Sequence, residues 1–168
     1  MPTTYEPIAT TTLGSAALSI TFSSIPSSYT DLKLIFSGTT TVLGYLAIQF
    51  NADTGANYSV TSLYGTGASA SSFAISSATE LNLSGIATTS LTAPFFIHTD
   101  IFSYAGSTNK TVLTGYNMDK NGSGGIERSV GLWRNTAAIT SLKLIVSNDP
   151  TITFSAGTTA TLYGIKNA

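Results

Sequence analysis

The sequence predicts an all-β chain, an antiparallel sandwich of jelly-roll type with about ten short strands. Apolar residues recur at every second position in many short segments, which is the spacing of strands and not of helices. Turn-forming residues separate these segments at near-regular intervals. With 168 residues, the chain has the size of one ordinary domain.

Ten segments carry the strand pattern. In chain order they are "AALSITF" (16–22), "DLKLIF" (31–36), "YLAIQF" (45–50), "VTSLY" (60–64), "ELNLS" (80–84), "FFIHTDIF" (95–102), "TVLTGY" (111–116), "SVGLW" (129–133), "TSLKLIV" (140–146) and "ATLYGI" (160–165). Connections such as "NADTGAN" (51–57) supply Gly, Asn and Asp, which tolerate positive φ and cap backbone groups. The Ser- and Gly-rich stretch 64–80 favours a loop or an edge strand over a helix.

The two ends of the chain differ in pattern. An unpaired strand as late as 160–165 would invite aggregation, so we expect it to pair inside the sheet beside an early strand. Residues 1–14 carry Pro2 and Pro7 and a Thr run, and they predict an extended N-terminal arm ahead of a single domain at 15–168.

The predicted arm has Tyr5, Pro7 and Ile8 as candidate partner-binding residues. On this interpretation, deletion of residues 1–12 leaves the β-domain folded and weakens attachment to a partner. The alternative is that the same residues form a first strand of the domain's own sheet.

The composition narrows the class of partner. Charged residues are 9% of the chain and the formal net charge is −1, so no basic field attracts nucleic acid or an anionic membrane. The absence of cysteine excludes disulfides and thiolate chemistry. The N-terminus lacks the features of a signal peptide, and the longest apolar runs are far shorter than a bilayer span, so we expect a soluble chain.

The chain is poor in groups that titrate or attack. Its one histidine, His98, lies two residues before Asp100, and the pair could orient a base for a serine, but no G-x-S-x-G motif is present. We expect His98 on a solvent-side or interface position. A structural role is expected for the carboxylates that could serve a glycan-cleaving activity, and changes of Glu127 or Asp100 would test it. These carboxylates are Glu6, Glu80, Glu127, Asp31, Asp53, Asp100, Asp119 and Asp149. The sequence predicts a protein that is not an enzyme.

Metal and phosphate motifs are incomplete. Asn51, Asp53 and Asn57 loosely resemble a calcium loop without the bidentate Glu that would complete it. The "GSGG" run at 122–125 follows Lys120 without a GK[ST] ending, and it is typical of a hairpin tip. No cofactor or metal is expected.

Aromatic residues are the remaining candidates for binding. Trp133, which precedes Arg134, is either a core-edge anchor or an interface residue. Four tyrosines at predicted strand ends are expected to be structural, with a glycan platform as the alternative: Tyr58, Tyr64, Tyr104 and Tyr116.

Four segments together resemble a group of small virion proteins of tailed double-stranded DNA bacteriophages, well represented among phages of cyanobacteria. The segments are "FSSIPSSYTDLKLIF" (22–36), "FNADTGANYSVTSLYGTG" (50–67), "VGLWRNTAAITSLKL" (130–144) and "FSAGTTATLYGIK" (154–166). The similarity spans nearly the whole chain, and its motifs describe β-structure and not chemistry.

The resemblance implies a structural component of the phage particle. Small jelly-roll proteins of such phages act as capsid cement or decoration proteins, often as homotrimers, on the outer surface of the head. The implied partners are the major capsid protein and further copies of the chain, and the implied location is the virion, after assembly in the host bacterial cytoplasm. Related modules in tail fibres and spikes provide the alternative, a receptor- or glycan-binding role.

Overall fold

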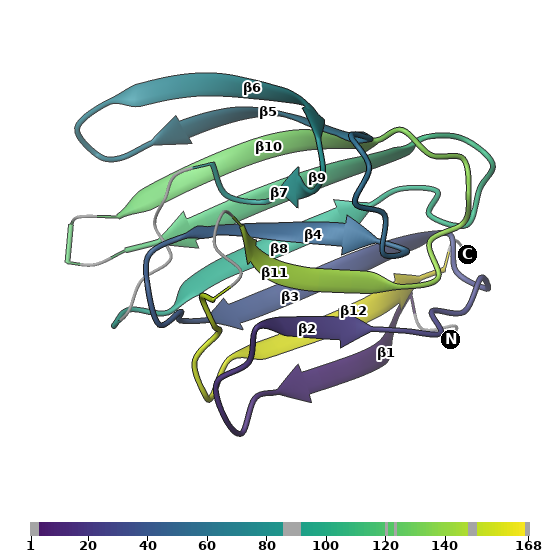
Figure 1. Ribbon diagram of the computed structural model, residues 1–168, viewed down its shortest axis with the longest axis horizontal. Coiled ribbons are helices and arrows are strands. Elements are labelled where there is room, and N and C mark those ends of the chain that lie inside the picture. The colour runs from purple at the N-terminus through teal and green to yellow at the C-terminus, as the bar shows by residue number, and fades with distance from the viewer. Residues whose placement is uncertain (1–3, 86–91, 120, 123, 148–150, 167–168) are drawn as a thin grey trace.

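The computed structural model describes residues 4–85, 92–119, 121–122, 124–147 and 151–166, which contain twelve strands and no helix. Every strand pair is antiparallel, and the strands form two sheets, as Figure 1 shows. The predicted all-β antiparallel sandwich is therefore confirmed. The strands are β1 (Tyr5–Thr12), β2 (Ser19–Phe22), β3 (Asp31–Gly38), β4 (Tyr45–Phe50), β5 (Tyr58–Gly65), β6 (Ala70–Ala78), β7 (Leu81–Asn82), β8 (Phe95–Ile101), β9 (Lys110–Met118), β10 (Gly125–Trp133), β11 (Leu142–Ser147) and β12 (Thr159–Ile165).

Strand pairing joins the beginning of the chain to its end. The large sheet has the order β1-β12-β3-β8-β9-β10-β5-β6, and the small sheet has the order β2-β11-β4-β7. Four of the pairs are nested in the sequence, which means that each pair encloses the next one along the chain. They are β1 with β12, β2 with β11, β3 with β8 and β4 with β7. The β5–β6 and β9–β10 hairpins lie outside this nest and extend the large sheet beyond β8. As predicted, the last strand pairs with early strands, since β12 lies between β1 and β3.

The core lies between the sheets and is rich in aromatic rings. The ring centroid of Phe36 lies 5.1 Å from that of Phe95 and 5.5 Å from that of Phe154, and Phe95 lies 6.0 Å from Tyr116. All four side chains are fully buried. These distances fall in the range of favourable aromatic pairs. The inward-facing residues of the strands form one continuous hydrophobic core.

All ten predicted segments contain strands, and the structure adds β1 and β6. Strand β6 is the outermost strand of the large sheet, which agrees with the edge strand expected within 64–80.

The prediction of an extended N-terminal arm is wrong for residues 4–14, because Tyr5–Thr12 pairs with β12 along its whole length. Pro7 has no N–H to donate, and it is tolerated because β1 lies at the sheet edge. The pairing register shifts between Pro7 and Ala9, and Ile8 at this bulge packs against the core. Residues 1–3 lie outside the described part.

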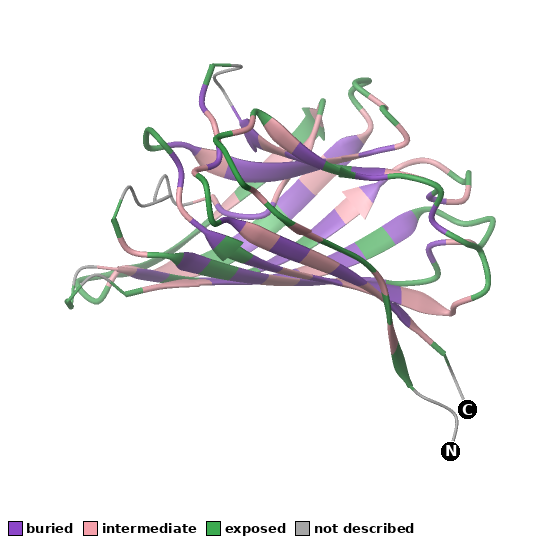
Figure 2. Cartoon of the chain, turned by 90° about the horizontal axis from the view of Figure 1, so that it is seen from below, coloured by how far each residue is buried: buried purple, intermediate pink, exposed green. Residues whose placement is uncertain are grey.

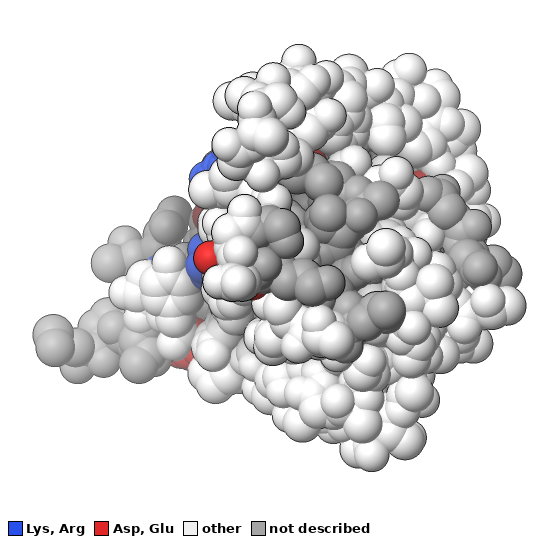
Figure 3. Space-filling model, turned by 90° about the vertical axis from the view of Figure 1, so that its left-hand side faces the viewer, with Lys and Arg blue, Asp and Glu red and all other residues white. Residues whose placement is uncertain are grey.

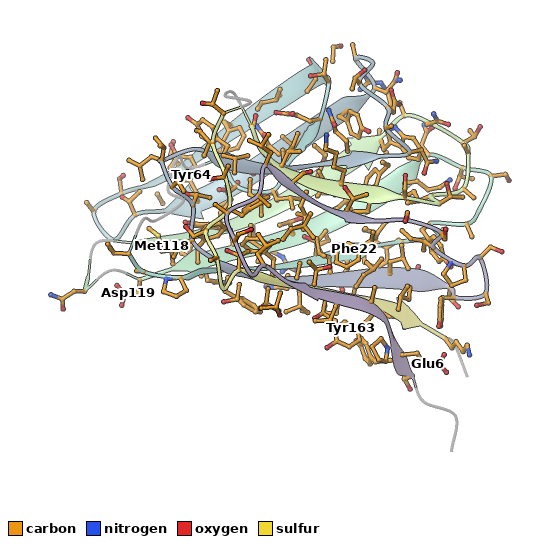
Figure 4. The ribbon with its side chains drawn as sticks, turned by 60° about the horizontal axis from the view of Figure 1, so that its bottom comes forward. Glu6, Phe22, Tyr64, Met118, Asp119 and Tyr163 are labelled. Atoms are coloured by element: carbon orange, nitrogen blue, oxygen red, sulfur yellow. The ribbon has the colours of Figure 1, made fainter. Side chains whose placement is uncertain are left out.

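Side chains also hold β1 in place. Glu6 accepts a hydrogen bond from the Tyr29 hydroxyl at 3.1 Å and forms an ion pair with Lys166 at 3.0 Å. The Lys166 amide donates to the Thr4 carbonyl at 3.1 Å. Figure 4 shows Glu6 at the end of the molecule away from Tyr64, Met118 and Asp119. Because Glu6 and Ile8 both contact the domain, β1 is part of it.

Candidate interaction surface

The outer face of the large sheet, the side turned away from the small sheet, carries exposed apolar side chains. Residues alternate between buried and less buried along β8 and β10, so Glu127 and Ser129 point inward while Ile126, Arg128 and Val130 point outward. Figure 2 shows this alternation along the strands. Ile126 and Leu63 are each 63% exposed, and Val130 is 48% exposed. This alternation leaves a group of large apolar side chains in contact with solvent.

We call these apolar side chains, together with the arginine that lies between them, the β5–β10 patch. It consists of Leu63, Ile126, Val130 and Arg128. Leu63 is the cross-strand partner of Arg128, and Ile126 and Val130 flank Arg128 along β10. Arg128 has no carboxylate partner among the described residues. The patch therefore combines apolar area with one cation that is available to a partner.

A glycine beside the β5–β10 patch leaves room for a neighbouring imidazole ring. Gly115 lies in β9 between its cross-strand partners Arg128 and His98. A Cβ atom at Gly115 would lie 2.2 Å from Cε1 of His98, so the imidazole occupies the space above the glycine. This geometry allows Nη1 of Arg128 to reach within 3.0 Å of Nε2 of His98. A hollow of about 390 Å³ lies here, and its lining includes Leu63, Gly115 and Ile126.

The contact with Arg128 sets the protonation state of His98. A guanidinium only donates, so Nε2 of His98 accepts and carries no proton. Burial lowers the pKa of His98, the positive charges of Lys33 and Arg128 lower it further, and Asp100 opposes them. Lys33 and Asp100 form an ion pair at 2.5 Å. The imidazole is therefore neutral at pH 7.

This arrangement predicts a pH-dependent stability. The folded-state pKa of His98 lies below its ordinary value of 6.5, so the unfolded chain binds more protons as the pH falls below 6.5. The contribution of neutral His98 is complete above that pH and is lost as the pH falls toward the lowered pKa. We expect the melting temperature of the wild type to fall between pH 7 and pH 5.5, and that of His98→Gln to fall less. Thermal unfolding of both proteins across this interval measures the difference, and superimposable profiles would contradict the assignment.

Two of the carboxylates considered for glycan cleavage, Asp100 and Glu127, lie on opposite faces of the large sheet. Asp100 is on the outer face with His98, whereas Glu127 is on the inner face and only 3% exposed. Glu127 accepts hydrogen bonds from Ser62 Oγ at 2.6 Å, Ser129 Oγ at 2.9 Å and the Gly85 amide at 2.8 Å. Two carboxylates on opposite faces cannot flank one glycosidic bond, so they do not form a catalytic pair.

Glu127 is a buried carboxylate whose hydrogen bonds link β5, β10 and Gly85, and this role was not predicted from the sequence. A signal for it was present, because Glu127 is in phase with Ser129, Gly131 and Trp133, all of which point inward.

Of the two interpretations of Trp133, the structure supports the core. Trp133 is fully buried, with its ring centroid 5.4 Å from that of Phe50, and its Nε1–H donates to Oδ2 of Asp53 at 2.8 Å. The interface role considered for it is therefore wrong. Arg134 is half-buried and donates to the Ala56 carbonyl.

The predicted tyrosines are mostly core residues as well. Tyr58, Tyr104 and Tyr116 are fully buried, and Tyr64 alone is half-buried. A glycan platform built from these four rings is excluded because three of them do not reach the surface.

The loop "NADTGAN" uses its carboxylate internally. Asp53 accepts hydrogen bonds from the Gly55 amide at 2.8 Å and from Asn57 Nδ2 at 3.0 Å, in addition to the bond from Trp133. Burial raises the pKa of Asp53, but these hydrogen bonds outweigh burial and lower it. Asn51 instead bonds the backbone of residues 138–141. In the described part of the chain, no group of three or more His, Asp or Glu side chains could hold a metal.

Strands β9 and β10 pair as a hairpin, and the described Gly122 and Gly124 lie between them, as expected of a hairpin tip. The Gly122 amide donates to Oδ1 of Asp119 at 2.8 Å. Lys120 and Ser123, which belong to the phosphate-loop comparison, lie outside the described residues.

A scan against models of known protein families finds no match for the chain. A search of curated proteins finds no significant relative. Among the residues that the structure describes, no helix has the length and apolar character needed to cross a membrane.

Proposed function

We propose that the chain is a non-enzymatic virion structural protein, a capsid cement or decoration protein on the outer surface of a tailed phage head. The β5–β10 patch is the observation that carries this proposal. Large apolar side chains that surround an arginine on an exposed sheet face are typical of protein contact surfaces. The patch fits a neighbouring protein surface that presents a carboxylate among apolar groups.

The fold supports the same proposal. The four nested strand pairs support a jelly-roll assignment, since a jelly roll is an antiparallel ribbon of eight strands that wraps into two sheets. The β5–β6 and β9–β10 hairpins are then insertions that widen one sheet. Jelly rolls are common in viral capsid proteins, and the virion proteins that the sequence resembles are small β-domains.

The proposed partners are the major capsid protein and further copies of the chain, assembled as a homotrimer. A shell repeats each contact many times, so contacts of modest strength add up to a large avidity. The low charge of the chain suits this role, because contact with a partner then buries few unpaired charges of the chain, and burial of unpaired charges is costly.

We test the proposal with phage heads that lack the chain. Ile126→Glu places a charge in the β5–β10 patch without touching the core, and loss of a buried Ile contact costs about 1.5–3 kcal/mol. We expect its affinity for heads to be at least about tenfold weaker than that of the wild type in co-sedimentation. Thr21→Glu, an exposed position on the small sheet, is the matched control and retains wild-type binding. Equal binding by Ile126→Glu and the wild type would overturn the assignment of the patch.

The hollow beside Gly115 favours one second candidate, a receptor- or glycan-binding module of a tail fibre. Binding of the isolated protein to a glycan array and to host cells distinguishes the two functions. Specific retention of the isolated protein, lost on Arg128→Gln, would favour the second candidate, and no retention agrees with the cement role.

A further inference from the structure

Among the residues that the structure describes, strand β6 is an open edge of the large sheet. It pairs with β5 on one side and is the last strand in the sheet order. Most of its residues are exposed, and Phe73 and Ile75 are half-buried. The outward backbone groups of an edge strand form a template on which another strand can pair.

The other edge of the same sheet is protected, whereas no described residue protects β6 in this way. Strand β1 carries Pro7, a bulge at Ile8 and the ion pair of Glu6, each of which hinders pairing with a further strand. Between Asp53 and Glu80, by contrast, the chain contains no charged residue and no proline. Figure 3 shows few charged atoms in its upper part, where β5 and β6 lie.

The pairing of β6 with β5 is regular from Ala70 to Ile75, and its one irregularity lies toward the C-terminal end. There, Ser77 has a φ of 55°. The edge is thus a regularly paired strand over most of its length.

The sequence of β6, "ASSFAISSA", reads nearly the same in both directions about Ala74. Antiparallel pairing with an identical strand, centred on Ala74, sets Ala opposite Ala and Ser opposite Ser. The one unlike pair is Phe73 with Ile75 of the second copy, which occurs twice by symmetry. Aromatic residues opposite β-branched residues are among the favourable cross-strand pairs.

Phe73 and Ile75 also point to the same side of the sheet. They are the cross-strand partners of Ser62 and Val60, both of which point inward. In the symmetric pair, the two half-buried side chains of one copy would meet those of the other and complete their burial.

We propose that β6 pairs antiparallel with β6 of a second copy, about a two-fold axis at Ala74, so that the large sheets of two copies become continuous. The contact does not depend on the phage role. Because a two-fold contact cannot close a ring of three, it would link one proposed trimer to the next.

Single-site cysteine variants of the full chain test the contact and its register. The chain has no cysteine, so Ala74→Cys gives a disulfide dimer only if two copies bring residue 74 together. Antiparallel partners have Cα atoms about 4.5–5.5 Å apart, within the span of a disulfide. We expect Ala74→Cys to cross-link under mild oxidation, and a mixture of Ser72→Cys with Ser76→Cys to cross-link into mixed dimers. Thr61→Cys, on the neighbouring strand opposite Ala74, is the control and stays monomeric on a reducing-agent-free gel.

A lysine substitution at the same site, Ala74→Lys, places two like charges opposite each other at the axis. We expect at least a tenfold weaker self-association in sedimentation equilibrium, while Thr61→Lys associates as the wild type does. Failure of Ala74→Cys to cross-link above the level of Thr61→Cys would overturn the proposal, as would unchanged self-association of Ala74→Lys. Neither readout involves phage heads, so the result is independent of the capsid-binding test.

Discussion

Deletion of residues 1–12 is expected to destabilise the whole domain. The deletion removes β1 from the large sheet, together with the Glu6 contacts to Tyr29 and Lys166 and the packing of Ile8. Each lost backbone hydrogen bond contributes about 1 kcal/mol, so the loss is about 3 kcal/mol or more. For a chain of this size, the melting temperature falls by about 6–12 °C, and the uncovered edge of β12 promotes aggregation.

The matched control is deletion of residues 1–3, which retains every described contact of β1. Circular dichroism and thermal unfolding compare the two truncated proteins with the full chain. An unchanged melting temperature after removal of residues 1–12 would restore the interpretation of this segment as a dispensable arm.

Trp133→Ala has the second large expected effect. Trp133 is fully buried, and its ring packs against Phe50 and Tyr58, with centroids 5.4 Å and 6.4 Å away. Truncation of a buried Trp costs about 3–5 kcal/mol, because it removes contacts and leaves a cavity. It also removes the indole N–H that donates a hydrogen bond to the Asp53 carboxylate. We expect the melting temperature to fall by about 6–20 °C.

Trp133→Phe separates packing from the hydrogen bond, since it keeps an aromatic ring and removes the indole N–H. We expect an intermediate loss of about 1–3 kcal/mol, the cost of a hydrogen bond to a charged group. Denaturant unfolding of the two variants gives the two losses. If Trp133→Ala unfolds at the wild-type denaturant concentration, the assignment of Trp133 as a core residue is wrong.

Much of the fold follows from local pattern, because strand positions are encoded by neighbouring residues. "DLKLIF" alternates clearly, and β3 buries Leu32, Leu34 and Phe36 as the pattern predicts. Strand β1 was only the alternative interpretation of its segment, because Pro7 and the Thr run weaken the alternation, and its stability comes from β12, more than 140 residues away in the chain. Long-range pairing of this kind leaves no local signal.

The candidate surface was less predictable than the fold. His98 was expected at a solvent-side or interface position, and it does lie on the outer face. Its partner Arg128 was not anticipated, because their contact depends on Gly115 in the strand between them. Ile126 and Leu63 belong to different hairpins, and only the order of the strands brings them to one surface.

The β5–β10 patch, the nested strand pairs and the β6 edge support one account, in which the chain binds other proteins in a repeating assembly. Cryo-electron microscopy of the phage particle that we propose to contain this chain tests that account most directly. The account predicts density for the chain on the outside of the head, with Ile126 and Arg128 buried against a neighbouring subunit. Density for the chain in the tail alone, or on the head with the outer face of the large sheet open to solvent, would contradict it.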